Sequence, residues 1–304
     1  MLNLPRTVRI REVGARDGLQ AEAPLTVGQR VELIDALLVA GITHLELAAF
    51  VSPKAVPSMA GATEVVDAVG APEGVVRAAL VPNLRGAEMA LAAGVDEITV
   101  TVSASAVYND LNVRMSIEES LTQIDDICRL AGGTGAGGRA GVPVDAVLSC
   151  AFGSPYEGDI APADVGLLVE RLKAGGVAAV TLADTTGMAT PRRLHEVLAL
   201  TGADVGLHLH ETRGTGLVNV YAGMQAGVTR FDTSVGGLGG SPFAAGATGN
   251  VATEEVVALC DDLGISTGIG IDALIDAALL FERMVGHSVP SRVAHSGPRS
   301  RRAG

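Results

Sequence analysis

The sequence predicts an α/β protein in which eight parallel strands close into a (β/α)₈, or TIM, barrel. In four segments a helical stretch ends in a small residue and glycine, and a β-branched apolar strand follows: LLVAGITHLEL, LAAGVDEITV, LKAGGVAAVTL and MQAGVTRFDTS. This repetition is typical of βα units and a parallel sheet. The 304 residues also suit a barrel, which needs about 250. No G-x-G-x-x-G follows the first predicted strand, which disfavours a doubly wound open sheet.

The elements can be placed in order from their periodicity and their bounding residues. Short apolar runs predict strands at about 7–13, 43–49, 75–81, 96–102, 143–150, 177–183, 204–210 and 230–235. Helical patterns lie near 26–40, 58–69, 85–93, 116–131, 162–175, 191–201, 215–226 and 252–263. Thr26, Ser116 and Thr253 are expected to cap their helices. We expect a barrel domain over 1–285 that ends in an extra helix near 271–285, followed by an irregular tail over 286–304.

Composition narrows the class of protein. Hydrophobic residues make up 48% of the chain but aromatic residues only 3%, and tryptophan is absent, so the core must be aliphatic. A formal net charge of −12 argues against nucleic acid as a partner, because such proteins need a basic surface. No apolar run reaches the roughly 18 residues that a membrane span needs, and the N-terminus lacks the apolar stretch of a signal peptide. The three cysteines, Cys128, Cys150 and Cys260, are too few and too far apart for a disulfide framework, so we expect a cytoplasmic protein.

Polar residues at the ends of the predicted strands are the candidates for an active site, because barrels place their chemistry at the carboxyl ends of the strands. In VGLHLHETRG, His208 and His210 lie two residues apart and would share one face of a strand. The other candidates at strand ends are Arg16, Asp17, Gln20, Glu46, Asp184, Ser241 and Asn250.

Each candidate also has a structural interpretation. Arg16 could form a salt bridge with Asp17 or with Glu46, and the histidines could be chance polar residues at a strand end. Asp184 could close the turn DTTG, and Asn250 could cap the next helix. Several independent strand ends that carry such residues nevertheless form the pattern of an active site.

The residue types point to one chemistry. Two imidazoles, the carboxylate of Asp17 and the amide of Asn250 form a mixed N/O ligand set that suits Mn²⁺ or Mg²⁺ and leaves two positions of an octahedral ion open. A substrate could chelate the ion there, and Arg16 beside it could stabilise an enolate. The pattern predicts carbon–carbon bond cleavage or formation next to a carbonyl. The only two lysines, Lys54 and Lys173, are not placed like the strand-borne lysine of a Schiff-base aldolase.

Eight motifs make the chain similar to the 3-hydroxy-3-methylglutaryl-CoA lyase family, within the wider group of metal-dependent barrel lyases and Claisen-type synthases. The resemblance covers residues 6–285 and rests on REVGARDGLQ, FVSPKAVPSM, VPNLRGAEMALAAGVDE, SIEESL, SPYEGDI, LADTTGMATP, HLHETRGTG and VGGLGGSPFAAGATGNVATEE. The synthases of that group usually carry an additional C-terminal region, for which 304 residues leave no room.

This resemblance implies a (β/α)₈ enzyme, usually a dimer, that uses Mg²⁺ or Mn²⁺ to cleave hydroxymethylglutaryl-CoA, an acyl-CoA thioester of leucine degradation, to acetyl-CoA and acetoacetate. It places the metal ligands on Asp17, His208, His210 and Asn250. It also implies that Arg16 stabilises the enolate, that His208 could move a proton, and that Arg16 and Gln20 contact the substrate. Glu46 and Asp184 are the carboxylates that it implicates in catalysis.

Four positions depart from the family pattern, and all are expected to touch the substrate pocket. Ser241 stands where the family usually has a loop cysteine, and Ala49 stands where it has a short hydroxyl side chain. Glu211 and Arg213 replace an aspartate and a tyrosine of the best-known members. Two alternatives therefore stay open: a related lyase for another 3-hydroxyacyl-CoA or a hydroxy-keto acid, and a non-catalytic barrel that binds metal or CoA.

Overall fold

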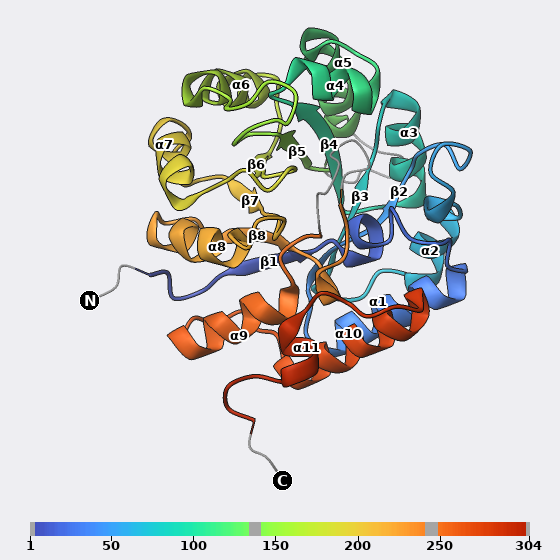
Figure 1. Ribbon diagram of the computed structural model, residues 1–304. Helices are drawn as coiled ribbons and strands as arrows, with labels where there is room; N and C mark the ends of the chain where they lie inside the picture. The colour runs from blue at the N-terminus through green and yellow to red at the C-terminus, as the bar shows by residue number, and fades with distance from the viewer. Residues whose placement is uncertain (1–3, 134–140, 241–248, 302–304) are drawn as a thin grey trace.

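A computed structural model describes residues 4–133, 141–240 and 249–301 of the chain. Eight parallel strands pair in chain order and close into a barrel, surrounded by helices, which confirms the predicted fold class (Figure 1). The strands are β1 (Arg9–Glu12), β2 (His44–Ala49), β3 (Val76–Leu80), β4 (Glu97–Ser103), β5 (Val144–Ser149), β6 (Ala179–Ala183), β7 (Gly206–His208) and β8 (Arg230–Thr233).

The helices follow the predicted pattern with two additions. The long helices are α1 (Val27–Val39), α2 (Ala62–Val69), α3 (Leu84–Ala93), α5 (Ile117–Gly132), α6 (Pro162–Ala174), α7 (Pro191–Thr201), α8 (Gly216–Gln225), α9 (Thr253–Leu263) and α10 (Ile271–Val285). Helix α10 is the expected extra helix, and it packs against α1. The additions are α4 (Ala106–Val113), which sequence periodicity missed, and α11 (Arg292–Ser296). No helix in the described part of the chain combines the length and apolarity that a membrane crossing requires.

Helix α11 corrects the expectation of an irregular tail after residue 285. Val289 and Ala294 are buried, and the Ser291 N–H donates to the carbonyl of Gly236 at 3.0 Å. The tail therefore packs on the loop that follows β8, because its apolar side chains find a partner surface there that no local pattern reveals.

Two of the three predicted helix caps are confirmed. Thr26 and Ser116 each accept a backbone N–H and form complete capping boxes. The prediction for Thr253 is wrong, because Ala252 is the N-cap of α9 and no side chain caps that end. The Thr253 hydroxyl instead contacts Glu12 and Thr233 in the interior.

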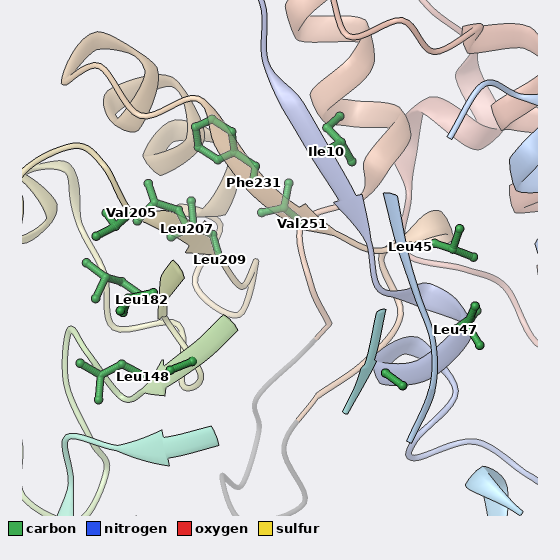
Figure 2. Packing of buried hydrophobic residues seen from close by; sticks show 14 of the residues in the cluster. Ile10, Leu45, Leu47, Leu148, Leu182, Val205, Leu207, Leu209, Phe231 and Val251 are labelled. Carbon is green, nitrogen blue, oxygen red and sulfur yellow. The ribbon is translucent and has the colours of Figure 1, made fainter. Parts of the chain in front are cut away.

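The barrel separates two kinds of side chain. Leu45, Leu47, Leu182, Leu207 and Phe231 point outward from the strands and pack against the helices in an aliphatic core (Figure 2). The residues that alternate with them face the barrel interior, where buried charged side chains gather: Arg11, Glu46, Asp145, His208 and Asp232. The period of two along each strand thus separates the folding core from the polar interior.

Candidate metal and substrate site

Three of the predicted ligands converge at the carboxyl mouth of the barrel. Asp17 lies in a single π-helical turn, η1 (Gly14–Gly18), directly after β1, while His208 ends β7 and His210 follows it. One ligand atom from each residue lies within 4.8 Å of the other two. The Nε2 atoms of His208 and His210 are 3.1 Å apart, so both rings direct the same nitrogen toward one point.

Asn250 joins this group from the connection between β8 and α9. Its backbone forms an isolated antiparallel bridge with His210, and its amide Nδ2 donates to Asp17 Oδ2 at 2.7 Å and to the Leu238 carbonyl at 3.0 Å. The Asn250 Oδ1 atom is buried and has no hydrogen-bond partner among the described residues. Since Ala252 is the N-cap of α9, a capping role for Asn250 is excluded.

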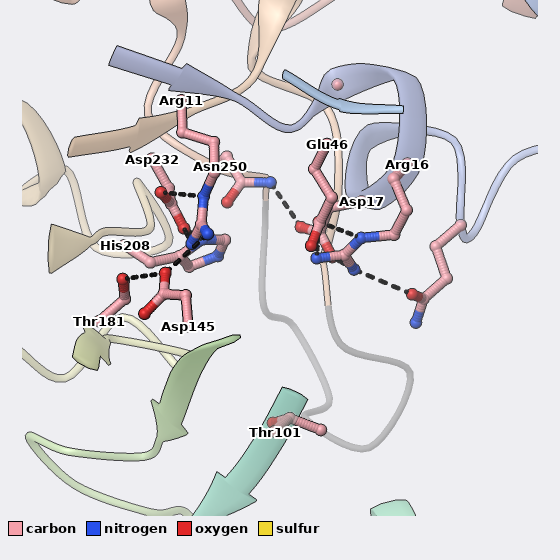
Figure 3. A network of polar contacts seen from close by, with 12 residues as sticks. Arg11, Arg16, Asp17, Glu46, Thr101, Asp145, Thr181, His208, Asp232 and Asn250 are labelled. Carbon is pink, nitrogen blue, oxygen red and sulfur yellow. Dashed lines mark hydrogen bonds and ion pairs between the residues drawn. The ribbon is translucent and has the colours of Figure 1, made fainter. Parts of the chain in front are cut away.

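Arg16 links the ligand group to a buried carboxylate (Figure 3). Its guanidinium donates to Asp17 Oδ1 at 2.7 Å, to Gln20 Oε1 at 3.3 Å and to Glu46. Burial raises the pKa of the Asp17 carboxyl, but the charge of Arg16 and that of His208 outweigh it and bring this pKa below its ordinary value. Arg16 therefore forms both of the ion pairs considered from the sequence, one with Asp17 and one with Glu46. Together they hold its guanidinium next to the candidate ligand Asp17.

Asp184 is buried at the end of β6, next to the ligand strand. Its backbone N–H donates to the His208 carbonyl at 2.8 Å, and its Oδ1 accepts the N–H of Ala189 at 2.9 Å. Burial raises the pKa of this carboxyl to about 7. Asp184 therefore does close the turn, as its structural interpretation suggests. Its Oδ2 atom, however, has no hydrogen-bond partner within the described residues.

Arg16, Asp17, His208 and His210 open onto a cavity of about 210 Å³, whereas Glu46, Asp184 and Asn250 lie behind its lining. One wall is polar and includes Arg16, Asp17, Gln20, His208 and His210. The rest of the lining combines apolar side chains with polar ones. The apolar residues are Val51, Val56, Leu80, Pro82, Val113, Val147 and Ala183, and the polar residues are Thr101, Tyr108, Asn112, Ser149 and Thr185. Such a cavity can hold a small oxygen-rich group against the ligands and an alkyl group on the other side. Neither lysine lines it, as the sequence led us to expect.

The positions that depart from the family pattern were expected to touch the substrate pocket, but none of the three that the structure describes, Ala49, Glu211 and Arg213, lines this cavity. Ala49 is buried in β2, and Glu211 accepts the backbone N–H groups of Gly216 and Leu217 at the start of α8. Arg213 donates to the Thr186 carbonyl at 2.7 Å and so holds the loop that carries Asp184. Ser241 lies outside the described residues.

Sequence reasoning missed Asp232 and Arg11, which lie directly beneath the ligands. Asp232 Oδ2 is 3.2 Å from His208 Nδ1, and Arg11 donates to both oxygens of Asp232. Burial lowers the pKa of His208, but the hydrogen bond to Asp232 and its charge raise it above the ordinary value. The available signal was a charged residue in the middle of a predicted buried strand, in RIREVG and in TRFDTS.

Gly239 was also missed, although the sequence singled out its glycine-rich loop. Its φ of 108° is in the left-handed region, and a Cβ placed there would lie 2.4 Å from Asn250 Nδ2 and 2.9 Å from Asp17 Oδ2. The loop backbone can therefore lie against two of the candidate ligands only because the residue is glycine.

The geometry of Asp17, His208 and His210 fits a divalent ion, and the chemistry of Asn250 is compatible with a fourth ligand. Adjacent ligands of an octahedral ion with bonds of about 2.0–2.1 Å lie about 3 Å apart, which matches the 3.1 Å between the two Nε2 atoms. Asn250 supplies a buried amide oxygen without a partner in the described part of the chain, and Asp17 supplies a carboxylate. Mixed imidazole and oxygen ligands without thiolate favour Mg²⁺ or Mn²⁺ over Zn²⁺.

Fold and site together define a (β/α)₈ barrel with a candidate metal site at its carboxyl mouth. The HMGL-like family model matches residues 7–280, and the chain belongs to this family. A 3-hydroxy-3-isohexenylglutaryl-CoA/hydroxy-methylglutaryl-CoA lyase of Pseudomonas aeruginosa is 42% identical over 299 residues, which cover 96% of this chain and 98% of the relative. The human mitochondrial hydroxymethylglutaryl-CoA lyase is 38% identical, over 97% of this chain and 91% of the relative.

Solved structures agree with this placement. A crystal structure of hydroxymethylglutaryl-CoA lyase from Pseudomonas aeruginosa superposes with a TM-score of 0.90 at 41% identity, over 96% of this chain and 97% of the other. An HMG-CoA lyase from Acinetobacter baumannii, solved in complex with coenzyme A and 3-methylmalate, also superposes with a TM-score of 0.90, at 36% identity and over 98% of both chains.

Proposed function

We propose that this chain is a divalent-metal-dependent carbon–carbon lyase that cleaves hydroxymethylglutaryl-CoA to acetyl-CoA and acetoacetate. The observation that carries the proposal is the convergence of Asp17, His208 and His210 beside Arg16 at the mouth of a barrel of the HMGL-like family. The proposed catalytic unit is the barrel over 1–285, with 286–304 as a C-terminal tail. We further propose that the enzyme acts as a homodimer in the cytoplasm.

A Mg²⁺ or Mn²⁺ ion held by Asp17, His208, His210 and Asn250 would polarise the hydroxyl and carbonyl oxygens of a chelating substrate. Loss of the proton from the C3 hydroxyl makes that carbon a ketone, and the C2–C3 bond breaks. The electron pair of this bond passes to the thioester as an enolate, which becomes acetyl-CoA when C2 gains a proton. Arg16 lines the cavity, and its guanidinium stabilises the enolate oxygen, while Gln20 helps to orient the substrate.

Proton transfer is assigned to the buried carboxyl group of Asp184 rather than to His208. Both nitrogens of His208 have neighbours, Nε2 facing His210 and Nδ1 facing Asp232. Asp184 is buried behind the lining, between Ala183 and Thr185, which do line the cavity. Its pKa of about 7 is close to the value that suits a general base near neutrality. Glu46 holds Arg16 in place through its ion pair. Ser241, from sequence alone, is proposed to position a hydroxyl or a water molecule.

The test is a cleavage assay on the purified chain with hydroxymethylglutaryl-CoA, in which acetoacetate formation is measured with added Mg²⁺ or Mn²⁺ and with EDTA. We expect EDTA to abolish activity and either metal to restore it. Asp17→Ala and His208→Ala should lose activity, whereas His195→Ala, which removes an exposed histidine on α7, should keep it. Full activity of the Asp17 and His208 variants without metal would overturn the proposal.

A second candidate substrate carries a longer alkyl branch at C3. The Pseudomonas aeruginosa relative is named for both isohexenylglutaryl-CoA and methylglutaryl-CoA substrates, and the cavity lining includes apolar side chains such as Val51, Leu80 and Val147. The same assay with the isohexenyl substrate decides between them. A kcat/KM at least tenfold higher for the isohexenyl compound would favour the second candidate, and the reverse ratio would favour the first.

A further inference from the structure

An arginine, an aspartate and a candidate metal ligand lie in one row across adjacent strands. Arg11 of β1 is paired in register with Asp232 of β8, and Asp232 is paired in register with His208 of β7. All three are buried and face the barrel interior (Figure 3). The strand register alone therefore brings an arginine, a carboxylate and a candidate metal ligand into contact.

The contacts within this row are directional. Arg11 Nε donates to Asp232 Oδ1 at 2.9 Å, and the terminal nitrogen NH2 donates to Oδ2 at 2.8 Å. The same Oδ2 lies 3.2 Å from His208 Nδ1. A carboxylate held by two guanidinium bonds can only accept from the imidazole, so Nδ1 must carry a proton. His208 Nε2, which faces His210, then keeps its lone pair for a metal ion.

We propose that Asp232, clamped by Arg11, is a positioning residue that fixes the tautomer of His208 and thereby sets the affinity of the metal site. The inference rests on the proposed function, because it takes His208 as a ligand. Arg11 and Asp232 do not touch the substrate in this proposal. They act through the imidazole, in the way that carboxylate partners of metal-bound histidines commonly do.

The barrel supplies a matched control. Asp145 of β5 contacts Arg11 from the opposite side, with its Oδ2 2.6 Å from the guanidinium, and accepts the Thr181 hydroxyl at 2.9 Å. It is as buried as Asp232 and neutralises the same arginine, but its described contacts do not include His208. Replacing either aspartate by asparagine removes one buried negative charge next to Arg11, and only the Asp232 change reaches the candidate ligand.

Asp232→Asn should invert the tautomer. Arg11 has only donors, so the amide oxygen of the new asparagine turns to Arg11 and its NH₂ group turns to His208 Nδ1. Nδ1 must then accept, and the proton moves to Nε2, where it competes with metal binding. In Asp145→Asn the amide oxygen can take the place of Oδ2, which faces Arg11 and accepts from the Thr181 hydroxyl, and His208 is unaffected.

The experiment measures Mn²⁺ binding to the full, metal-free chain by calorimetry without substrate. We expect Asp232→Asn to weaken binding by about 10–100-fold and Asp145→Asn to stay within about threefold of the unsubstituted protein. Long-range ¹H–¹⁵N spectra of the histidine rings of the metal-free proteins should show the His208 proton on Nδ1 in the unsubstituted chain and in Asp145→Asn, and on Nε2 in Asp232→Asn.

Equal Mn²⁺ affinity of the two asparagine variants, or a His208 tautomer that does not change, would overturn the inference. Absence of Mn²⁺ binding by the unsubstituted chain would instead overturn the proposed function, so the two failures are distinguishable. If Asp232→Asn does not fold, Arg11→Lys asks the same question, because a lysine cannot donate to both Asp232 oxygens in the geometry of a guanidinium. Its Mn²⁺ affinity should fall several-fold, and an unchanged affinity would again overturn the inference.

Discussion

At the scale of single residues, Arg16 shows how the site depends on a fixed side chain. It contacts Asp17, Gln20 and Glu46 at once, so its guanidinium occupies one position at the edge of the cavity. Only the planar fork of arginine offers donors in these directions, whereas the ammonium of lysine is a single point.

Arg16→Lys should therefore lower kcat by about 10²–10³-fold with little change in KM, since the lost donors act on the charge of the transition state. Steady-state kinetics on hydroxymethylglutaryl-CoA at saturating metal measure both constants. Arg192→Lys, at an exposed position of α7, is the control. A rise in KM at unchanged kcat would mean that Arg16 only binds substrate.

At the scale of elements, the helix caps and the hydrogen bonds between β1 and the segment after β8 fix the positions of the loops. The carboxylate of Glu12 accepts the backbone N–H groups of Gly14 and Val235 and contacts the Thr253 hydroxyl. It thereby ties the turn that carries Asp17 to the segment that leads to Asn250. Gly236 N–H donates to a second buried carboxylate, Glu254, beside it.

Burial raises the pKa of Glu12 from 4.5 to about 7, so its charged form is disfavoured in the folded state. The stability contributed by the protonated form is complete below about pH 4.5 and is lost as the pH rises to about 7. In Glu12→Gln the amide oxygen can still accept from Gly14 and Val235, and the NH₂ group can donate to the Thr253 hydroxyl, but the side chain cannot ionise. Between pH 4.5 and 7, the free energy of unfolding of Glu12→Gln should rise relative to that of the unsubstituted chain, by about 3 kcal/mol at most.

Urea unfolding of both proteins at several pH values between 4 and 8 measures this difference. Glu118→Gln, on the exposed side of α5, controls for the loss of one carboxylate. A difference between Glu12→Gln and the unsubstituted chain that stays constant with pH would show that Glu12 does not titrate in this range.

Thr26→Ala should cost about 1 kcal/mol of unfolding free energy, because it removes the hydroxyl that accepts the Gln29 N–H at the start of α1. Chemical denaturation provides the measurement. Thr122→Ala, in the exposed middle of α5, removes a similar hydroxyl where no cap is formed and should not destabilise. Equal effects of the two changes would argue against the cap.

At the scale of the whole molecule, the barrel holds an aliphatic layer outside its strands and a charged interior within them. Arg11, Asp145 and Asp232 pair across this interior below the candidate ligands. Binding of a metal ion above them would add stability to the folded chain alone, because the ligands come from strands that are far apart in the unfolded chain.

Mn²⁺ at about 100 times its dissociation constant should therefore raise the unfolding free energy by about 2.7 kcal/mol, visible as an upward shift in the thermal midpoint that EDTA reverses. His210→Ala should show no such shift, and His195→Ala should show it in full. A shift of equal size in His210→Ala would place the bound ion elsewhere.

The barrel itself could be predicted from the sequence, because the signals are local. Gly41, Gly94, Gly176 and Gly227 all have positive φ, as helix ends followed by strands require. The alternation in VGLHLHE separates Leu207 and Leu209 from His208 and His210 by backbone geometry alone. The strand ends then predicted which polar residues would meet, since parallel strands present their carboxyl ends at one mouth.

Only the tertiary structure decided what lies between elements. Arg11 and Asp232 are 221 residues apart, and their contact depends on barrel closure between β1 and β8. Contacts between loops that are distant in the sequence likewise determine three other features. These are the interior contact of Thr253, the packing of α11 and the close approach of Gly239 to Asn250. Local propensity and periodicity report the conformation of neighbouring residues along the chain. They do not report which distant partner a buried charge finds, and that partner determines whether the charge is structural or serves the site.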